Sequence, residues 1–344
     1  MRIVNLCGGE GSERDVSLAS GWAVTRSLQE RGHEVVVVDP AAPTPVLAGP
    51  LGPQAPLEEA SIPKEPPLLD DQRQRRKRMH TALTGGPVLD LLREADLVFI
   101  ALHGGWGEDG HVQALLEMAD IRFTGAGSAA CAASFHKGRA RAVLAAAGLP
   151  VAEQVQWFPV SGEIPQDVEK LMGAGPVVVK PAANGSSVSV RLADSLSQLA
   201  HLAETAPKES ELVVEPYLPG REFSVPVVGD QVLPVVEIEL TTPILDYATK
   251  YQPGAVNKVC PARAPAAFTS RLQEHALRGH QALGFGSNSY SRTDFRCNAQ
   301  GEPMCLEVNG LPSLTAGSML PLAAREAGWT YDDLIQRITD LSAR

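Results

Sequence analysis

The sequence predicts an α/β protein of two or three domains, and three observations lead to this prediction. The chain has 344 residues, which is more than one domain usually contains. In its first third, apolar strand-length runs alternate with amphipathic helical stretches, as in parallel α/β units. Near its C-terminus, two half-buried strand patterns flank a turn-like segment, and hydrophobic residues make up 44% of the whole chain, enough for a substantial core.

The N-terminal unit is expected at residues 1–125. Its apolar strand runs are short and bounded by helical patterns, and Gly32 stands where the first helix is expected to end. This alternation favours a parallel sheet with helices packed against it. The expected order is strand, helix, strand, helix, strand, at residues 2–6, 16–31, 34–38, 88–93 and 97–102.

An insertion of about residues 41–85 interrupts this pattern. Its first part, from Pro40 to Pro67, is rich in proline and has no periodicity, which is typical of a surface segment. A basic run follows, for which we expect a solvated helix face, with an anion or partner site as the alternative. The run consists of Arg73, Arg75, Arg76, Lys77 and Arg78.

Two further units are expected, at residues 126–211 and 212–344. The second opens with an alanine-rich helix, residues 129–147, and continues into an apolar strand at 176–180. The third contains strands and ends in a hairpin. Its strands before the hairpin are expected at residues 212–214, 223–228 and 232–238.

The hairpin carries the strongest chemical signal in the chain. It pairs the segment RTDF (292–295) with LEVN (306–309), and in the second of these apolar and polar residues alternate. Pairing the two strands brings Asp294, Glu307 and Asn309 together. Hard oxygen ligands of this kind suit Mg²⁺. A solvated strand face with an ordinary salt bridge is the alternative interpretation.

The loop after the first strand, Gly8–Arg14, invites a dinucleotide-binding interpretation. That fingerprint needs glycine at three spaced positions. With Gly9 and Gly11 as the first two, the third position falls on Arg14, where close packing of helix on strand would be lost. We therefore expect this loop to present Glu13 to a ligand, with an acid that merely caps the helix as the alternative.

Two more loops follow apolar strands. Residues 103–110 contain several glycines, which indicates a backbone close to a ligand, although His103 by itself would more often be a structural hydrogen-bonding residue. Lys180 is followed by a Gly-Ser-Ser turn and can offer an ammonium and backbone N–H groups to phosphate oxygens. An ordinary turn would explain the second pattern equally well.

Composition excludes several classes of protein. A formal net charge of −10 disfavours nucleic acid as the main partner. No run of about 18 apolar residues is present, so no membrane span is expected. The start, MRIVNLCGG, lacks the pattern of a secretory signal, and the five cysteines show no CxxC spacing. We expect a cytoplasmic protein with reduced thiols.

Eight segments of the chain, taken in order, are specific for one family. They are GGEGSERDVSLASG, HGGWGEDGHVQALLE, FHKGRARAVLAAAGLP, VVVKPAANGSSVSV, VVEPYLPGREFSV, LDYATKY, RTDF and LEVNGLPSLTAGSMLP. On these segments the chain resembles the ATP-grasp ligases and, within them, the D-alanine–D-alanine ligase family. The likeness extends over nearly the whole sequence, except about residues 41–85.

The resemblance implies a three-domain ATP-grasp architecture, in which an N-terminal parallel α/β domain is followed by two α+β domains that enclose the nucleotide. It implies ATP-dependent ligation of two D-alanines to D-alanyl-D-alanine through an acylphosphate, for peptidoglycan precursor synthesis, by a homodimer. A ligase for another amino acid or a hydroxy acid such as D-lactate is the alternative. Tyr251 favours D-alanine over D-lactate, because a tyrosine at this place accompanies dipeptide formation in the family.

The resemblance also assigns roles to residues. ATP would be bound by Lys137, Lys180, Glu215, Tyr217, Leu218, Glu222 and Lys250. Two Mg²⁺ ions, or Mn²⁺, would be bound by Asp294, Glu307 and Asn309, in agreement with the hairpin pattern. Substrate binding and catalysis would involve Glu13, His103, Ser186, Tyr251, Arg292, Ser313, Ser318 and Met319.

Among these, Glu13 would bind the ammonium of the first D-alanine, and Ser318 with the Met319 backbone would bind the carboxylate of the second. Arg292 and a backbone N–H near Ser313 would stabilise an oxyanion. Ser186 and Tyr251 would hydrogen-bond with Glu13 and close a loop over the site. The sequence departs from the usual pattern of the family at Ala183, Asn184, Ser189 and Ser313, and the last two replace common glycines.

Overall fold

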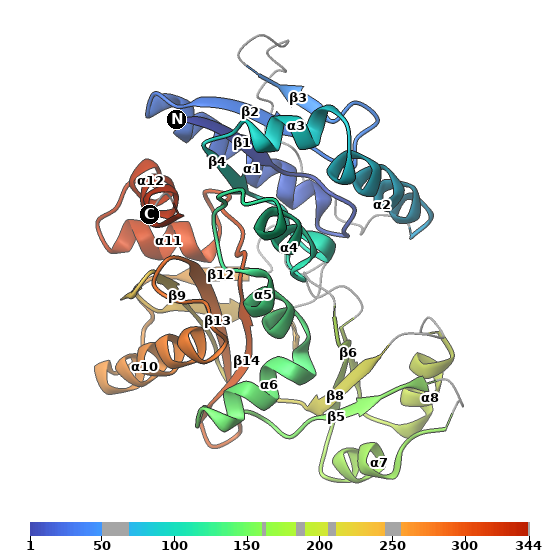
Figure 1. Ribbon diagram of the computed structural model, residues 1–344. Helices are drawn as coiled ribbons and strands as arrows, with labels where there is room; N and C mark the ends of the chain where they lie inside the picture. The colour runs from blue at the N-terminus through green and yellow to red at the C-terminus, as the bar shows by residue number, and fades with distance from the viewer. Residues whose placement is uncertain (50–68, 160–162, 184–189, 206–210, 245–255, 343–344) are drawn as a thin grey trace.

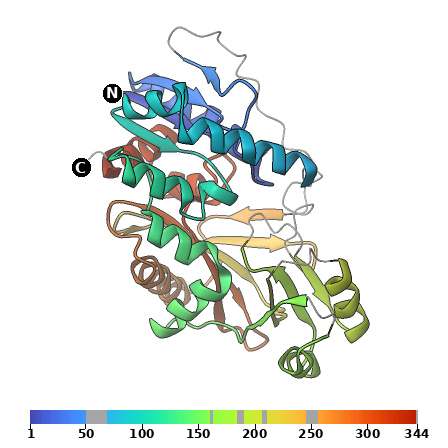
Figure 2. The same ribbon diagram turned by 45° about the vertical axis from the view of Figure 1, so that its right-hand side comes forward.

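A computed structural model gives the fold (Figures 1 and 2). Its described strands form three sheets, one in each of three regions of the molecule. Within the described part of the chain, no helix is both long and apolar enough to cross a membrane. The structure describes residues 1–49, 69–159, 163–183, 190–205, 211–244 and 256–342.

The N-terminal sheet has the strand order β3-β2-β1-β4, and β1 pairs in parallel with both β2 and β4. The predicted strand–helix alternation is therefore confirmed, with each boundary within about two residues. The elements are β1 (Arg2–Leu6), α1 (Arg14–Glu30), β2 (Glu34–Val38), β3 (Val46–Ala48), α2 (Leu69–Thr84), α3 (Pro87–Arg93), β4 (Leu97–Ile100), a short 3₁₀ turn (Gly105–Gly107) and α4 (His111–Met118).

The insertion contains one strand that was not expected and the helix that was expected for its basic run. β3 forms an antiparallel edge strand on β2, in a stretch where no periodicity was seen, because three residues are too few to show an alternation. The basic run lies on α2, which extends across the front of this unit in Figure 2. Arg73, Arg76 and Lys77 are exposed, as a solvated face requires, whereas Arg78 donates from Nε to the Ala41 carbonyl at 2.7 Å.

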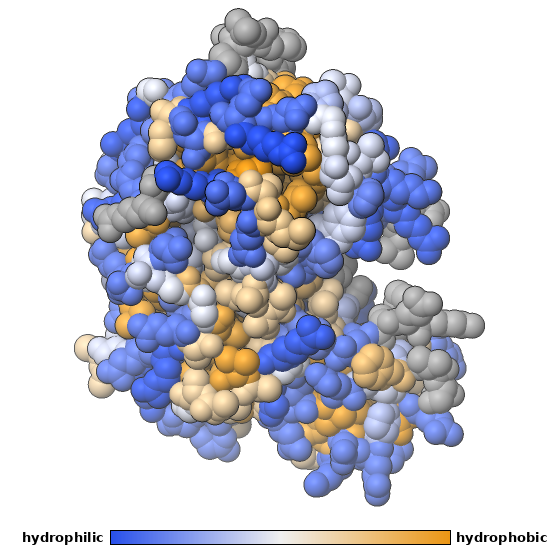
Figure 3. Space-filling model, viewed as in Figure 1, coloured by the Kyte–Doolittle hydropathy of each residue, from blue (hydrophilic) through white to orange (hydrophobic). Residues whose placement is uncertain are grey.

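The middle sheet has the order β5-β8-β6-β7, with antiparallel pairing throughout. It forms a separate lobe at the lower right of Figure 1, and Figure 3 shows an indentation between this lobe and the upper part of the molecule. Its elements are β5 (Val155–Trp157), α7 (Gln166–Gly173), β6 (Val177–Pro181), β7 (Arg191–Ala193), α8 (Leu196–Thr205) and β8 (Leu212–Pro216).

The C-terminal sheet has the order β12-β11-β9-β13-β14, with β10 paired to β9. The helices α5, α6 and α10 pack on it, and their apolar side chains share one core with Phe223 and Val308. The elements are α5 (Ser128–Phe135), α6 (Lys137–Ala146), β9 (Glu222–Val228), β10 (Gln231–Val232), β11 (Val236–Leu240), β12 (Val256–Val259), α10 (Ala266–Ala282), β13 (Tyr290–Cys297) and β14 (Pro303–Asn309).

Several expectations need correction here. The strand at 212 belongs to the middle sheet as β8, so the chain leaves that sheet after Pro216 and not at residue 211. The expected helix at 129–147 is divided at His136, which has an extended backbone, and both halves pack with the C-terminal sheet, not with the unit expected at 126–211. The expected strand at 232–238 is interrupted between β10 and β11.

The last two helices, α11 (Met319–Glu326) and α12 (Tyr331–Ser342), return to the N-terminal unit. Leu320, Leu334 and Ile338 share one core with the strands β1, β2 and β4. At the rim of this contact Arg31, which follows α1, pairs with Asp333 on α12 at 2.6 Å. The N-terminal and C-terminal regions are therefore joined by a continuous apolar core, which fixes the loop 310–318 against α1.

Candidate active site

The β13–β14 hairpin is paired as the sequence predicts. Its turn is held by Asn298, whose side-chain oxygen accepts two backbone N–H groups of the turn at 3.0 and 2.9 Å. The register places Asp294 opposite Glu307 and Arg292 opposite Asn309. Because alternate residues of a strand face the same side, these polar side chains gather on one face of the sheet.

Cations surround the two carboxylates of this face. Arg292 donates to Asp294 from Nε and Nη2 at 2.9 and 2.7 Å, and Ser224 donates to the same carboxylate at 2.6 Å. Glu307 lies 3.8 Å from the Lys137 ammonium and 4.0 Å from the Arg292 guanidinium. Its side chain is 35% exposed, whereas that of Asp294 is 12% exposed, so Glu307 is the more accessible of the two acids.

The donor set fits a hard divalent cation. Asp294 and Glu307 supply carboxylate oxygens, and the Asn309 side-chain oxygen, which accepts the Leu311 N–H at 2.9 Å, has a second lone pair. Mg²⁺ is usually bound through one or two carboxylates, with water and phosphate oxygens completing its shell. In the described chain no three His, Cys, Asp or Glu side chains cluster as metal ligands, so this mixed acid and amide set is the candidate.

The middle sheet contributes a buried ion pair. Val177 and Val179 point to the core under α7 and α8, so the alternation places Lys180 on the opposite face of β6. There its ammonium donates to Glu215 on β8 at 2.6 Å. Lys137, at the start of α6, lies beside them with its side chain 11% exposed, and burial lowers the pKa of its ammonium. Two of the lysines predicted to bind phosphate are thus brought together.

Arg296 contacts two of the residues that are predicted to hold adenine and ribose. The Arg296 guanidinium lies 3.4 Å from a Glu222 oxygen and 5.2 Å from the centre of the Tyr217 ring. Arg296 and the Tyr217 hydroxyl both donate to the Pro243 carbonyl, at 2.6 and 3.1 Å. Leu218 is buried next along the chain.

Sequence reasoning missed Arg296. Its signal was available, since position 296 shares a strand face with Arg292 and Asp294.

Glu13 is the residue that precedes α1, and its side chain makes no capping hydrogen bond. The carboxylate instead lies against Gly104, where an added Cβ would stand 3.1 Å from Glu13 Oε2. Gly104 has φ of +68°, a conformation that favours glycine. The glycine-rich loop after β4 therefore approaches the Glu13 carboxylate closely, which favours presentation to a ligand over a capping role.

Asp39 argues further against a dinucleotide site. It is fully buried, pairs with Arg14, and accepts the backbone N–H groups of Gly9 and Ala41 at 3.1 and 3.0 Å. Its carboxylate thus holds the loop after β1 in place and is not directed outward to a ribose. Arg14, which breaks the glycine pattern in the sequence, is the partner that makes this arrangement possible.

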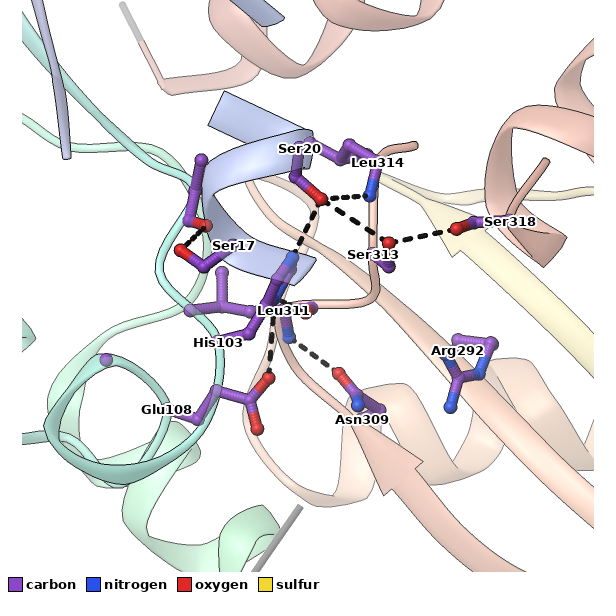
Figure 4. Close-up of polar contacts among 12 residues, drawn as sticks. Ser17, Ser20, His103, Glu108, Arg292, Asn309, Leu311, Ser313, Leu314 and Ser318 are labelled. Carbon is purple, nitrogen blue, oxygen red and sulfur yellow. Dashed lines mark hydrogen bonds and ion pairs between the residues drawn. The ribbon is translucent and has the colours of Figure 1, made fainter. Parts of the chain in front are cut away.

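The N-terminal unit meets the loop 310–318 through His103 (Figure 4). His103 is buried, and its two ring nitrogens each lie 3.0 Å from an oxygen, one of Ser20 on α1 and one of the Leu311 carbonyl. Glu108 lies 3.8 Å from the ring, and burial raises the pKa of its carboxyl. Ser20 and Glu108 lie in segments that the sequence singled out, but neither residue was assigned a role, because their contacts join distant parts of the chain.

Ser318 precedes α11, whose first residue is Met319, so its hydroxyl stands beside the backbone N–H groups of a helix N-terminus. Ser318 Oγ donates to Ser313 Oγ at 2.9 Å. Among the described non-glycine residues only Asp120 has a positive φ, so the serine that replaces a common glycine at 313 is unstrained.

Three predicted site residues, Ser186, Lys250 and Tyr251, lie outside the described residues. The departures Asn184 and Ser189 also lie there.

Both halves of the chain match models of known protein families. Residues 2–126 match the family model described as D-ala D-ala ligase N-terminus, and residues 143–340 match the one described as D-ala D-ala ligase C-terminus. The first match runs through residues 41–85, so the likeness extends across the insertion that was expected to lie outside it.

Similar proteins cover the chain almost completely. The D-alanine–D-alanine ligase of Anaeromyxobacter sp. strain Fw109-5 is 35% identical over 99% of this chain and 97% of its own length. That of Halalkalibacterium halodurans is 33% identical over 100% of both. The Bacillus anthracis D-alanine–D-alanine ligase complexed with ATP has a similar fold, with a TM-score of 0.74 at 24% identity over 99% of this chain and 97% of that chain. The resemblance predicted from the sequence is confirmed.

Proposed function

Because the chain belongs to the D-alanine–D-alanine ligase family, we propose that it joins two D-alanine molecules into D-alanyl-D-alanine for peptidoglycan precursor synthesis, and that ATP is converted to ADP and phosphate. The observation that carries this proposal is the hairpin, where Asp294 and Glu307 face each other beside Arg292. Lys137 and Lys180 converge on the same region from two other elements.

The nucleotide is proposed to bind between the middle and C-terminal sheets. Glu215, Tyr217 and Leu218 follow one another along β8 and its exit, and Glu222 begins β9, so one continuous segment offers adenine and ribose contacts. Lys180 would exchange its ion pair with Glu215 for contact with a phosphate. Lys137 and, as the resemblance implies, Lys250 would contact the phosphates as well.

In the first step the carboxylate of the donor D-alanine attacks the γ-phosphorus, the bond to the β-phosphate oxygen breaks, and an acylphosphate and ADP result. Negative charge spreads over the phosphoryl oxygens, so fixed cations supply most of the stabilisation. Mg²⁺ ions held by Asp294, Glu307 and Asn309, with Mn²⁺ as a substitute, would neutralise phosphate charge there.

In the second step the acceptor D-alanine, with its ammonium deprotonated to the amine, forms a bond from nitrogen to the acyl carbon. The carbon–oxygen bond to phosphate breaks, and the nitrogen gives up one proton to the departing phosphate or to water. Glu13 would hold the donor ammonium. Arg292 and the Ser313 N–H would stabilise the oxyanion, and Ser318 with the Met319 N–H would bind the acceptor carboxylate at the start of α11. His103 would support this subsite from the N-terminal unit.

The resemblance adds three further expectations. Ser186 and Tyr251 would hydrogen-bond with Glu13 and close the site, which would protect the acylphosphate from water. The active species would be a homodimer, which light scattering coupled to gel filtration tests directly. The cytoplasm, where ATP is available, would be its location.

The test is ADP release from ATP and Mg²⁺ with D-alanine, L-alanine or D-lactate, with mass analysis of the products. We expect one ADP per D-alanyl-D-alanine, and turnover with the D-amino acid alone. ADP release that depends on D-lactate as acceptor would instead indicate a depsipeptide ligase. A protein that binds ATP without turnover on any of these compounds would refute the proposal.

A further inference from the structure

We infer that the Ser313 hydroxyl is a positioning residue for the carboxylate of the acceptor amino acid, because it orients the Ser318 hydroxyl. This inference rests on the proposed function and adds a side-chain role to the backbone N–H discussed above. Ser313 stands in the loop between β14 and α11, where the sequence departs from a common glycine. The hydroxyl that this departure adds lies within a connected set of polar contacts (Figure 4).

The contacts between Ser313, Thr315 and Ser318 are local in sequence, and those of the Ser318 hydroxyl are the shortest. Ser318 Oγ donates to Ser313 Oγ at 2.9 Å and lies 2.6 Å from Thr315 Oγ1. Ser313 Oγ also accepts the Thr315 N–H at 3.4 Å. Both serines are half-buried, so a ligand can reach them. Ser313 and Thr315 thus hold the Ser318 hydroxyl at the N-terminus of α11, where the acceptor carboxylate is expected.

The far side of Ser313 meets the N-terminal unit. Ser313 Oγ is 3.4 Å from Ser20 Oγ, which in turn is 3.0 Å from His103 Nε2. The Leu311 carbonyl can only accept a hydrogen bond, so His103 Nδ1, at 3.0 Å from it, is a donor, and with a single ring proton the other nitrogen, Nε2, is an acceptor. Nε2 then accepts from Ser20, and Ser20 has no second hydrogen to give.

These constraints fix the direction of the remaining bonds. Since the Ser20 hydrogen goes to His103, Ser313 must be the donor in its contact with Ser20, and it accepts from Ser318. The hydrogen bonds therefore run from Ser318 through Ser313 and Ser20 to His103. The Ser313–Ser20 contact is the longest of them at 3.4 Å, so it is the weakest and is given up most easily.

Arrival of a carboxylate requires a change of direction, because a carboxylate offers acceptors and no hydrogen. Ser318 must turn its hydrogen from Ser313 to the ligand. Ser313 can then break its long contact with Ser20 and donate its hydrogen to Ser318 Oγ. This new hydrogen bond replaces the one that Ser318 had donated to Ser313. Alanine or glycine at 313 has no such hydrogen, and the Ser318 oxygen would lose a partner when the ligand binds.

The decisive experiment measures ADP release against D-alanine concentration in S313A and fits the two successive binding steps separately. We expect the KM of the acceptor step to rise about 5- to 15-fold, with the KM of the donor step and the KM for ATP nearly unchanged. S313T keeps a hydroxyl and should recover most of the loss. S289A is the matched control, because Ser289 is a buried serine that bonds a backbone carbonyl at 2.8 Å away from the site.

A double variant tests the route through Ser318. If Ser313 acts by orienting Ser318, S313A should have no further effect on the acceptor KM in an S318A background. Additive effects would overturn the inference, as would an unchanged acceptor KM in S313A, or a KM for ATP that rises equally. If the wild-type protein has no ligase activity, both the proposed function and this inference are wrong. If the wild-type protein is active and the variants give the contrary results just named, only the inference is wrong.

Discussion

Two regions of the candidate active site are built in different ways. The hairpin site, consisting of Arg292, Asp294, Glu307 and Asn309, lies on two adjacent strands joined by a short turn. The interdomain network, consisting of Ser20, His103, Leu311, Ser313 and Ser318, joins segments as far as 293 residues apart. The first region faces the phosphates in the proposed reaction, and the second faces the acceptor carboxylate.

The difference lies in what holds each region together. The hairpin site depends on strand register and on a buried pair between Arg292 and Asp294, so local pairing suffices to assemble it. The interdomain network depends on the apolar core that α11 and α12 share with the N-terminal sheet, because that core sets the distance between Ser20 and the loop 310–318. Changes in the first region should therefore affect phosphate chemistry, and changes in the second should affect acceptor binding.

The largest effect is expected in the hairpin site, from Glu307→Ala. The more exposed carboxylate of the pair is lost, and with it a candidate metal ligand, so kcat for ADP release should fall at least about 100-fold. The measurement is ADP release at saturating D-alanine over a range of Mg²⁺ concentrations. Calorimetric titration of the variant with Mg²⁺ and a non-hydrolysable ATP analogue should show weakened metal-dependent binding.

Glu302→Ala provides the matched control. Glu302 also lies next to this hairpin, but it is exposed and pairs with Arg271 at 3.1 Å, away from the candidate ligands. It should keep nearly full activity. Near-normal ADP release by Glu307→Ala, or an equal loss in both variants, would contradict the metal assignment.

The hairpin site was predictable because its information is local. The alternation in residues 306–309 and the turn after residue 297 determine the register, and so the partner of Asp294. The division of the helix at His136 was not predictable, since the alanine-rich sequence continues through it. The His136 ring is held by Glu211 at 3.0 Å, a contact across 75 positions.

The interdomain network could be predicted only in part. The resemblance supplied His103, Ser313 and Ser318, but neither the connection through Ser20 nor the use of the Ser313 hydroxyl follows from the spacing of residues. Arg296 is an intermediate case. The alternation along its strand predicts which face of the sheet it lies on, but its partners Tyr217 and Pro243 come from other segments. Contacts between distant segments depend on tertiary packing, which no local pattern contains.

Arg296→Leu tests the part of the hairpin that lies next to the proposed adenine and ribose contacts. Without the guanidinium, Glu222 loses its contact with Arg296 and the Pro243 carbonyl loses a donor at 2.6 Å, so the ribose and adenine contacts would be misplaced. The KM for ATP should rise about 10-fold with kcat changed less than about threefold. Arg296→Lys should recover part of this loss. An altered acceptor KM with an unchanged KM for ATP would contradict this role.

A pair of tyrosine variants should separate the two regions with the same chemical change. Tyr217 donates to the Pro243 carbonyl at 3.1 Å near the hairpin, and Tyr331 donates to the Leu314 carbonyl at 2.8 Å beside the interdomain network. Each Tyr→Phe substitution removes one hydroxyl, so each should change one KM about 2- to 10-fold. Tyr217→Phe should raise the KM for ATP, and Tyr331→Phe the KM of the acceptor step. Equal effects of both variants on both constants would show that the two regions are not independent.

The smallest effect is expected behind the hairpin, where His280 on α10 contacts Ser291 on β13 at 2.7 Å and the Gly286 carbonyl at 2.8 Å. Burial lowers the pKa of His280 below its ordinary value. Near pH 6, His280 is therefore protonated to a larger extent in the unfolded chain than in the folded protein. Stability should be constant above about pH 6.5 and fall as the pH drops from there toward the folded pKa, by at most about 1.4 kcal/mol per pH unit for this one group.

Urea unfolding between pH 5 and 7.5 measures this slope. His280→Gln should flatten it at the cost of some stability at neutral pH, whereas His80→Gln, at an exposed position on α2, should leave it unchanged. Because His280 supports the strand that carries Arg292 and Asp294, loss of stability at low pH should be accompanied by loss of ADP release before the acceptor KM changes. If the acceptor KM rises before ADP release falls, the interdomain network is weakened before the hairpin site at low pH, and the expected order of the two regions is wrong.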